Sequence, residues 1–321
     1  MKLKPNLQLK ITHNSNDFAS DLITALRLRP RSISPKYFYD TKGSALFDQI
    51  CNLPEYYPTR TELSILRRKA HEMAELMGPR AELVEFGAGS LHKVRMLLDA
   101  MQAPSRYIPI DISGDHLHAS CSLLQDDYPS LDIHPLIADY TSPLILPAPI
   151  SAKSKRIGFF PGSTIGNFTP REARAFLHMA ASVLRGGALI LGVDLIKAPH
   201  LLHAAYNDTQ GITAQFNLNL LERANRELDA DFDIDKFSHY AFYNAPMQRI
   251  EMHLMSRCQQ QVHIQNERYE FDEGETLHTE NSYKFTLKGI RSIAQLAGFI
   301  PGPVWCDKEG LFSLHWLQAP S

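Results

Sequence analysis

The residues most informative about chemistry form a glycine turn that leads into a lysine. The segment Glu85-Phe-Gly87-Ala-Gly89-Ser-Leu-His-Lys93 follows a predicted strand and precedes a predicted helix. Glycines at such a junction let the backbone turn sharply and approach a bound ligand. A dinucleotide-binding GxGxxG fingerprint would need a third glycine where His92 stands. The substitution disfavours a cofactor with a pyrophosphate, whereas S-adenosylmethionine has none and tolerates it.

Acidic residues end the next two predicted strands, at Asp111 and Asp139. A carboxylate after the second strand can accept hydrogen bonds from both ribose hydroxyls of a nucleoside. Asp139 can accept from an adenine amino group while the ring of Tyr140 packs on the purine. Singly, each aspartate is better explained as the cap of a following helix, and Lys93 as a solvated lysine. Together and in order, they favour a nucleoside cofactor, with Lys93 as a cation for its methionyl carboxylate.

The elements that must position these residues alternate between strands and helices. Helix-length segments separate the strands, which predicts a parallel, doubly wound sheet. The stretch PVWCDKEGLFSLHWL near the C-terminus predicts a hairpin around Asp-Lys-Glu-Gly. We therefore expect an α/β fold, a Rossmann-like class I methyltransferase sheet with a C-terminal antiparallel hairpin. The expected strands are 82–87, 106–112, 132–139, 156–162 and 188–195, and the expected helices are 93–101, the segment ending near 125, and 170–184.

A second α+β domain is expected from the rest of the chain. Apolar spacing predicts helices over 16–28, 44–53 and 62–77, with a proline-broken aromatic loop over 55–62. Residues 200–228 look helical, 236–285 are rich in strand patterns, and 289–299 predict a helix. The predicted boundaries are 60–197 with 286–321 for the cofactor-binding domain, and 1–59 with 198–285 for the substrate-binding domain.

Composition excludes several classes of protein. The 321 residues include 33 basic and 35 acidic side chains, a net charge of −2, which favours neither nucleic acid nor an anionic membrane as partner. The four cysteines are far apart, as expected of reduced thiols in the cytoplasm. No apolar segment follows Met1 and no run of 18 apolar residues occurs. We expect a cytoplasmic protein, and a monomer because no coiled-coil repeat is present.

Four long segments carry a resemblance to a known family: YFYDTKGSALFDQICNLPEYYPTRTE (37–62), GSTIGNF (162–168), AAYNDTQGITAQFN (204–217) and LHTENSYKF (277–285). In these segments, and over nearly its whole length, the chain resembles the L-histidine Nα-methyltransferases of the ergothioneine pathway. The resemblance implies that S-adenosylmethionine is used to trimethylate the α-amino group of L-histidine to hercynine. It also implies that histidine is held between a methyltransferase domain and a substrate domain.

The resemblance assigns roles to individual residues. Tyr56 and Asn167 match positions that hold the amino and carboxylate end of the substrate, and Tyr206 matches a further carboxylate contact. Glu280 and Ser282 match the pair that reads the imidazole ring, and in a strand both would point to one face. Tyr39 and Phe47 match aromatic residues beside the amine, and Met252 matches a wall of the side-chain pocket. Five further residues match positions that contact the cofactor: Gly87, Lys93, Asp111, Asp139 and Tyr140.

These residue types suit methyl transfer to an amine. Holding the amine beside the methyl group is worth about 7–11 kcal/mol in favourable cases. Aromatic faces attract the growing positive charge by about 0.5–2 kcal/mol per contact, although most single aromatic residues are ordinary core. No strong general base stands out, so the first proton goes to water or its removal is assisted by Tyr39, the candidate catalytic residue.

Two alternative functions stay open. The first keeps the fold and cofactor but methylates another amino acid or an indole-derived amine, because one related branch acts on prenylated tryptophan; Glu280 and Ser282 favour histidine. The second is a non-catalytic S-adenosylmethionine-binding protein or an NAD-dependent one, which the missing third glycine disfavours. The 14 histidines show no spacing with acidic or cysteine ligands that would predict a metal site.

Overall fold

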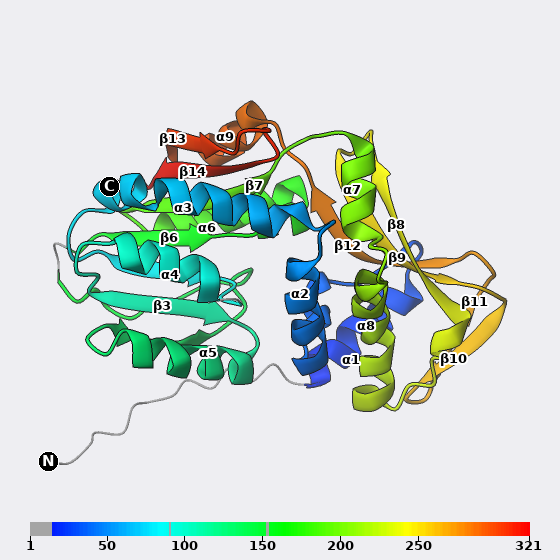
Figure 1. The fold of residues 1–321 in the computed structure, drawn as a ribbon. Helices are drawn as coiled ribbons and strands as arrows, with labels where there is room; N and C mark the ends of the chain where they lie inside the picture. Colours follow the sequence, from blue (N-terminus) through cyan, green and yellow to red (C-terminus); the bar gives the residue numbers. More distant parts are fainter. Residues whose placement is uncertain (1–14, 90, 152–153) are drawn as a thin grey trace, which may run out of the picture.

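The computed structural model describes residues 15–89, 91–151 and 154–321, which form two lobes joined side by side (Figure 1). One lobe is built on a large sheet with helices on both faces, and the other packs helices against a smaller sheet. Residues 1–14, where the sequence predicts no apolar leader segment, and Ser90 of the glycine turn lie outside the described residues.

The large sheet has eight strands, in the order β13-β14-β7-β6-β2-β3-β4 with β5 paired to β3. β2, β3, β6 and β7 are parallel, and β14 lies antiparallel between β7 and β13. This confirms the predicted methyltransferase sheet with its C-terminal antiparallel hairpin. The strands are β2 (Glu82–Phe86), β3 (Arg106–Asp111), β4 (Asp132–Ile133), β5 (Leu136–Ile137), β6 (Arg156–Phe160), β7 (Ala188–Asp194), β13 (Ile300–Cys306) and β14 (Phe312–Gln318).

Alternate residues of each central strand face opposite layers of helices. In β2, Leu83 enters the core beneath two helices while Val84 enters the core on the other side. Both side chains are fully buried, which is why these strands read as continuous apolar runs. Helices α3 (Tyr57–Met77) and α4 (Leu91–Ala100) cover one face, α6 (Pro170–Val183) and α9 (Leu287–Leu296) cover the other, and α5 (Gly114–Asp127) packs near β3.

The second lobe has its own core, formed by segments from both ends of the domain's sequence. Its sheet has the order β1-β12-β9-β8, with β12 parallel to β1 and antiparallel to β9, and β10 and β11 form a separate hairpin. Its elements are α1 (Ser15–Arg27), β1 (Arg31–Ser32), η1 (Pro35–Phe38), α2 (Thr41–Asn52), α7 (Pro199–Tyr206), α8 (Ile212–Leu228), η3 (Ile234–Lys236), β8 (Phe237–Asn244), β9 (Arg249–Ser256), β10 (Gln260–Ile264), β11 (Glu267–Phe271) and β12 (Thr276–Tyr283).

Three predicted elements were wrong in detail. The aromatic loop expected over 55–62 is helical from Tyr57 onward, because Pro58 sits in the first turn, where a missing N–H costs nothing. The strand expected over 132–139 is two pieces of two residues each. The helical stretch 200–228 is divided between Tyr206 and Ile212, where Gly211 has φ +71° and Asp208 accepts from the first N–H groups of α8.

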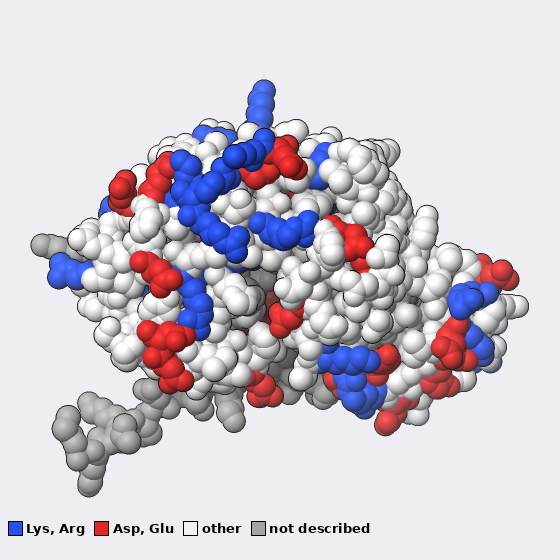
Figure 2. Space-filling model, viewed as in Figure 1, with Lys and Arg blue, Asp and Glu red and all other residues white. Residues whose placement is uncertain are grey.

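The surface mixes charges of both signs. Figure 2 shows Lys and Arg side chains gathered over α3, which supplies the exposed Arg60, Arg67 and Arg68, with acidic side chains interspersed around them. In the part of the chain that the structure describes, none of the helices combines the length and apolar character needed to cross a membrane.

Candidate active site

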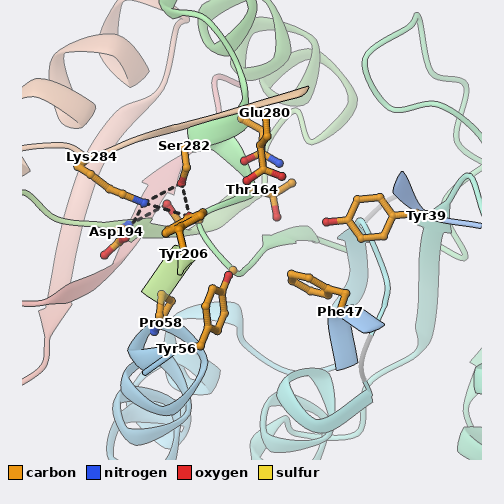
Figure 3. Close-up of a pocket in the computed structure, with 13 residues that line it drawn as sticks. Tyr39, Phe47, Tyr56, Pro58, Thr164, Asp194, Tyr206, Glu280, Ser282 and Lys284 are labelled. Carbon is orange, nitrogen blue, oxygen red and sulfur yellow. Dashed lines mark hydrogen bonds and ion pairs between the residues drawn. The ribbon is translucent and has the colours of Figure 1, made fainter. Parts of the chain in front are cut away.

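A cavity lies where the two lobes meet, and polar side chains from both lobes enter it (Figure 3). The start of α3, the turn after β6 and the end of β7 contribute from the large-sheet lobe. The segment after η1, helix α2, the end of α7 and strand β12 contribute from the other. Its lining residues are Tyr39, Phe47, Tyr56, Pro58, Gly162, Ser163, Thr164, Asn167, Asp194, Tyr206, Glu280, Ser282 and Lys284.

Seven of the eight residues expected around the substrate line this cavity. They come from distant parts of the sequence: Tyr39, Phe47, Tyr56, Asn167, Tyr206, Glu280 and Ser282. The exception is Met252, which is buried on β9 directly opposite Glu280 in the strand register and is not a lining residue. Directly opposed residues project to the same face of a sheet. Met252 therefore lies beside Glu280, and its role as a wall of the side-chain pocket stays a prediction.

Aromatic rings form one side of the cavity. The Phe47 ring lies edge-on to Tyr39, with ring centroids 5.7 Å apart, and edge-on to Tyr56 at 6.3 Å. In Figure 3 the Tyr39 hydroxyl points toward the middle of the cavity. Burial raises the pKa of Tyr39 well above the usual value, and does the same for Tyr56. Both phenols therefore stay protonated at neutral pH and act through neutral hydroxyl groups.

The GSTIGNF segment forms a tight turn that brings Asn167 to the cavity. Gly162 and Ser163 both have left-handed backbone conformations, with φ of +74° and +58°. A side chain is rarely accepted at such angles, but the Ser163 hydroxyl accepts a hydrogen bond from the backbone N–H of Asp194 at 2.9 Å. Gly166 packs against β12, and a Cβ there would lie 2.8 Å from the carbonyl oxygen of Tyr283. The turn thus joins β6, β7 and β12 at one point.

Strand β12 and the residue that follows it present three side chains to the cavity at every second residue: Glu280, Ser282 and Lys284. None of the described residues donates a hydrogen bond to the Glu280 carboxylate. Burial raises the pKa of Glu280 to about 7, and the positive charge of Lys284 limits the rise. A carboxyl group with such a pKa is partly protonated at neutral pH. An N–H group of a ligand that donates to it favours the ionised form.

The sequence interpretation missed Lys284 and Asp194. Their signal was present, because Lys284 continues the two-residue spacing of Glu280 and Ser282, and Asp194 ends a predicted strand. The Lys284 ammonium lies 2.9 Å from a carboxylate oxygen of Asp194. It donates to the hydroxyl of Ser282 at 2.7 Å and to that of Tyr206 at 3.3 Å.

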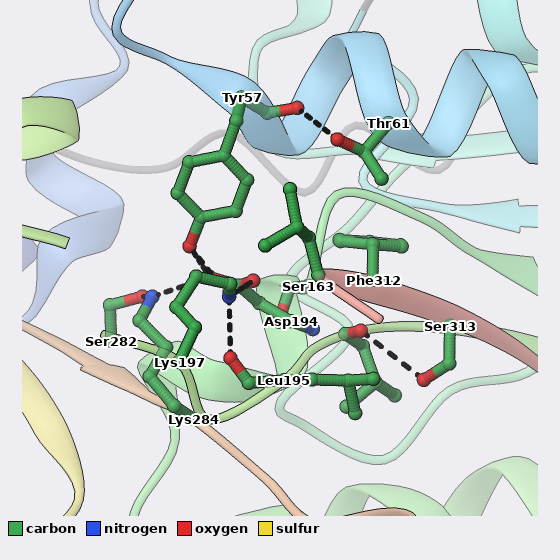
Figure 4. A network of polar contacts seen from close by, with 12 residues as sticks. Tyr57, Thr61, Ser163, Asp194, Leu195, Lys197, Ser282, Lys284, Phe312 and Ser313 are labelled. Atoms are coloured by element: carbon green, nitrogen blue, oxygen red, sulfur yellow. Dashed lines mark hydrogen bonds and ion pairs between the residues drawn. The ribbon is translucent and has the colours of Figure 1, made fainter. Parts of the chain in front are cut away.

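Asp194 is the centre of a larger buried network (Figure 4). Its second oxygen pairs with the Lys197 ammonium, and the Tyr57 hydroxyl donates at 2.7 Å to the first oxygen, which faces Lys284. Burial would raise the pKa of Asp194, but Lys284 and Lys197 outweigh burial and the net shift is downward. Asp194 is therefore ionised, and it connects the start of α3, the end of β7 and strand β12.

On the large-sheet side, Gly87 and Asp111 lie at neighbouring strand ends, as predicted for a cofactor site. Gly87 has φ +74°, and its N–H donates to the carbonyl of Ile110 at 2.8 Å. One carboxylate oxygen of Asp111 accepts from the N–H of Ser113 at 2.8 Å, the capping role weighed above. The backbone N–H of Ile112 also contributes a hydrogen bond to this carboxylate. A carboxylate has about four lone-pair sites, so a ligand can still donate to it. Burial raises the pKa of Asp111.

Asp139 and Tyr140 lie at the end of the next strand segment. Asp139 accepts from the N–H of Thr141 at 2.9 Å and from the Lys36 ammonium at 3.4 Å. Lys36 belongs to the other lobe, so this contact bridges the lobes. The Tyr140 ring packs edge-on against Phe86 and Phe160, with ring centroids 6.5 and 5.6 Å apart. Its hydroxyl would lie 3.4 Å from a Cβ on Gly87.

Lys93 is not a solvated lysine. Its ammonium lies 2.7 Å from Glu62, a fully buried carboxylate of α3 that also accepts from the N–H of Gly162 at 3.0 Å. Burial opposes the charge on Lys93, but the Glu62 carboxylate outweighs burial and the pKa of Lys93 is raised. Among the described residues only Glu62 pairs with this ammonium, so two of its three N–H groups can face a second anion. Glu62, also missed from sequence, holds that cation beside the glycine turn.

One cluster outside the cavity has metal-ligand side chains close together: Glu251, His253 and His278, with ligand atoms within 4.8 Å of one another. The two imidazole rings are stacked, with centroids 4.5 Å apart and planes 15° apart. Stacked rings direct their in-plane lone pairs side by side, not toward one ion. Glu251 is already paired with the Arg249 guanidinium at 2.7 Å. The cluster is explained by its own hydrogen bonds, so we assign it no metal.

Comparison with known proteins identifies the family. Residues 18–319 match the model of a family described as "Histidine-specific methyltransferase, SAM-dependent". The chain is 42% identical over 301 residues to a histidine N-alpha-methyltransferase of Mycobacterium tuberculosis, covering 92% of each chain. It is 31% identical over 268 residues to ergothioneine biosynthesis protein 1 of Neurospora crassa, covering 77% of this chain and 30% of that one.

A more distant relative has a different printed substrate. The chain is 25% identical over 218 residues to a 4-dimethylallyltryptophan N-methyltransferase of Claviceps purpurea, which covers 64% of this chain and 63% of the relative.

The raised pKa of Glu280 predicts a pH-dependent cost to stability. Its pKa is 4.5 when exposed and about 7 in the folded protein, so the unfolded chain ionises first. Its contribution is fully present below pH 4.5 and is lost as the pH rises through 7. Glu280→Gln should therefore gain about 2–3 kcal/mol over the unmodified protein between pH 5 and pH 8. Urea unfolding at both pH values measures this difference.

Glu251→Gln is the matched control, because Glu251 lies on the neighbouring strand. Although burial opposes it, hydrogen bonds from Arg249 and Asn244 lower the pKa of Glu251. The contribution of Glu251 is complete above about pH 4.5, so the Glu251→Gln difference should stay nearly constant between pH 5 and pH 8. A Glu280→Gln difference that stays constant from pH 5 to pH 8 would contradict the raised pKa.

Proposed function

Because this chain belongs to the family of histidine-specific, S-adenosylmethionine-dependent methyltransferases, we propose that it transfers three methyl groups to the α-amino nitrogen of L-histidine, giving hercynine. The observation that carries the proposal is the cavity between the lobes. It has the Glu280 carboxylate and the Ser282 hydroxyl on β12, the Tyr39 and Tyr56 hydroxyls on another side, and the Tyr206 hydroxyl at one end. These groups match the ring, amine and carboxylate of one small amino acid.

We assign cofactor binding to residues 60–197 with 286–321, and substrate binding to 1–59 with 198–285. The remaining lone pairs of the Asp111 carboxylate suit a ribose hydroxyl, and the available N–H groups of Lys93 suit the methionyl carboxylate. Tyr140 lies against Gly87 where an adenine ring would pack, and Asp139 would accept from the adenine amino group. When bound, S-adenosylmethionine supplies an electrophilic methyl group on a sulfonium.

On the substrate side, Glu280 accepts an N–H from the imidazole ring and Ser282 addresses the same ring. A buried carboxylate that accepts such a hydrogen bond fixes the orientation and tautomer of the ring. Asn167 and Tyr206 hold the carboxylate, and Tyr56 holds the amine end. Met252, opposite Glu280 on the neighbouring strand, is the proposed wall of the side-chain pocket.

Tyr39 holds the amine but does not take its proton as a phenolate. Its raised pKa keeps the phenol protonated, so its oxygen accepts an N–H of the amine while the proton released before attack goes to water. The nitrogen lone pair is then free to attack the methyl group in line. The faces of Tyr39, Phe47 and Tyr56 stabilise the cation that forms, by about 0.5–2 kcal/mol for each ring that reaches it.

Methylation of an indole-derived amine is the second candidate, because a relative with that printed substrate covers 64% of this chain. An indole ring offers one N–H and no second ring nitrogen, so it would leave Ser282 unused. A role in ergothioneine biosynthesis belongs to this proposal, since a relative carries that name. The cytoplasmic location, the monomeric state and the lack of nucleic-acid, membrane and metal partners stay predictions.

The proposal predicts trimethylation of L-histidine by the purified protein. Incubation with S-adenosylmethionine should give a product three methyl groups heavier than histidine, which mass spectrometry detects. Tryptophan and 4-dimethylallyltryptophan serve as competing substrates in the same mixture. A histidine that gains no methyl group refutes the proposed function, and methylation of the indole substrates instead supports the second candidate.

The cofactor assignment predicts a loss of affinity in Asp111→Ala. Two hydrogen bonds to a charged acceptor are lost, so S-adenosylmethionine affinity should fall about 10- to 100-fold in calorimetry. Asp115→Ala, at an exposed position in the first turn of α5, should change affinity less than about 2-fold. Equal affinities for the two variants would contradict the assignment, and binding of NAD would favour the dinucleotide alternative.

The role of Tyr39 predicts unequal effects on the three methylations. Tyr39→Phe removes an acceptor for N–H groups, so the first methylation should slow about 10-fold. Nα,Nα-dimethyl-L-histidine has no N–H when neutral, so its methylation should change less than about 3-fold. Single-turnover rates with both substrates measure the effect, and Tyr240→Phe, an exposed position away from the cavity, is the control. Equal slowing of both steps would argue against hydrogen bonding to the amine.

A further inference from the structure

Strand β12 changes the face that it presents just before it reaches the cavity. Leu277 pairs with Leu254 of β9, and both belong to the core of this lobe. Glu280 pairs with Met252, which lies two residues before Leu254 and belongs to the same core. Opposed residues project to the same face of a sheet, as do residues two apart in one strand. Leu277 and Glu280 therefore share a face, although three positions separate them, a spacing that places residues of a regular strand on opposite faces.

The change of face comes from a β-bulge at Thr279. The register between β12 and β9 shifts between His278 and Glu280, so Thr279 is an extra residue on β12 beside the pair of Glu280 and Met252. An extra residue of this kind re-aims the side chains that follow it. In a regular strand, Glu280 and Ser282 would share the face of His278, which is opposite to the cavity.

The side chain of Thr279 anchors the bulge. Thr279 is fully buried, and its hydroxyl oxygen lies 2.8 Å from the side-chain oxygen of Asn217 and 3.0 Å from the backbone carbonyl oxygen of Met252. Both of these neighbours accept, so the hydroxyl group is the donor. On the other side of the bulge, Nε2 of His278 lies 2.9 Å from the backbone carbonyl oxygen of Glu280, so this nitrogen carries a proton and donates.

Asn217 is held in one orientation by its neighbours. Its side-chain nitrogen donates to the backbone carbonyl of His253 at 3.0 Å and to Nδ1 of His239 at 2.9 Å. A flipped amide would place two acceptor oxygens against each other at His253. Because Nδ1 of His239 accepts, its Nε2 carries the proton and donates to the backbone carbonyl of Tyr206 at 2.9 Å. One fully buried amide thus connects Thr279 of the bulge to the end of α7, from which Tyr206 enters the cavity.

We propose that the bulge at Thr279 determines the specificity of the site for the imidazole ring, and that Thr279 and Asn217 are its positioning residues. The bulge turns Glu280 and Ser282 to the cavity, and the contact between the Thr279 hydroxyl and the Asn217 amide fixes the angle at which Glu280 enters. Neither Thr279 nor Asn217 is among the residues that line the cavity, so both act through Glu280. This inference rests on the proposed function, since it concerns how the ring-binding residues are aimed.

Loss of the Thr279 hydroxyl group would release the bulge. The side-chain oxygen of Asn217 would stay buried without its donor, and the backbone could relax to relieve this. Under the proposed function, Glu280 accepts a charge-assisted hydrogen bond from the ring, and such a bond weakens steeply when its distance or angle changes. A misplacement of about 1 Å at a site of this kind can cost about 100-fold in rate.

A double-mutant cycle separates positioning from a general loss of structure. Thr279→Val keeps the shape of the side chain but removes the hydroxyl group, so it should lower kcat/KM for L-histidine at least about 10-fold. In the Glu280→Gln background the charge-assisted hydrogen bond is already absent, so the same substitution should cost less than about 3-fold. Thr279→Ser, which keeps the hydroxyl group, should retain kcat/KM within about 3-fold.

Thr276→Val is the matched control, because Thr276 lies on β12 before the bulge and its hydroxyl group contacts Nδ1 of His253 at 3.1 Å. It should change kcat/KM less than about 2-fold in either background. Each rate is divided by the amount of folded protein, which the stoichiometry of S-adenosylhomocysteine binding measures in calorimetry. A variant that folds poorly therefore still gives a valid result.

The cycle has outcomes that overturn the proposal. Equal losses from Thr279→Val in both backgrounds would indicate a merely structural role for this residue. Thr279→Ser that is as slow as Thr279→Val would show that the hydroxyl group does not aim Glu280. Failure of the unmodified protein to methylate L-histidine would instead refute the proposed function.

Discussion

The architecture of the site depends on one buried carboxylate shared by two lysines. Asp194 ends the last parallel strand of the large sheet. Its partners Tyr57, Lys197 and Lys284 come from α3, the segment after β7, and the residue directly after β12. Removing one partner from such a group strands a charge away from water, which costs about 3–5 kcal/mol. The cluster therefore fixes β12 against the end of β7. Ser282 and Glu280 precede Lys284 at two-residue spacing on β12. Fixing the C-terminal end of this strand therefore positions all three side chains.

The large sheet could be predicted because its signals are local. Residues 82–87, 106–112 and 188–195 are apolar runs bounded by turns, and such runs become buried parallel strands wherever helices cover both faces. The acids at 111 and 139 followed from strand order alone. The second lobe could be predicted only as a class, because its core joins residues 18–57 to residues 202–277. Periodicity contains no information about which of those distant segments pack together.

The residues missed from sequence share a physical reason. Glu62, Asp194 and Lys284 are charged side chains that are almost fully buried, and burial of a charge depends on a partner elsewhere in the chain. Glu62 lies 31 positions before Lys93, and Lys284 lies 90 positions after Asp194. The segments that carry the family resemblance show the converse. In YFYDTKGSALF, Asp40 caps α2, and a Cβ on Gly43 would lie 1.7 Å from the carbonyl oxygen of Phe38. There the backbone itself restricts the sequence.

Three successive methylations change the amine of the substrate at every step, whereas its ring and its carboxylate stay the same. The nitrogen loses an N–H donor at each of the first two steps and ends as a permanent cation, so its hydrogen bonds to Tyr39 and Tyr56 cannot hold it throughout. The ring and the carboxylate do not change. Under the proposed function, Glu280 and Ser282 bind the ring, and Asn167 and Tyr206 bind the carboxylate, so both unchanging groups are held at a fixed separation. The nitrogen then returns to the same point among the aromatic rings at every step, and the rings bind it more strongly as its charge becomes permanent.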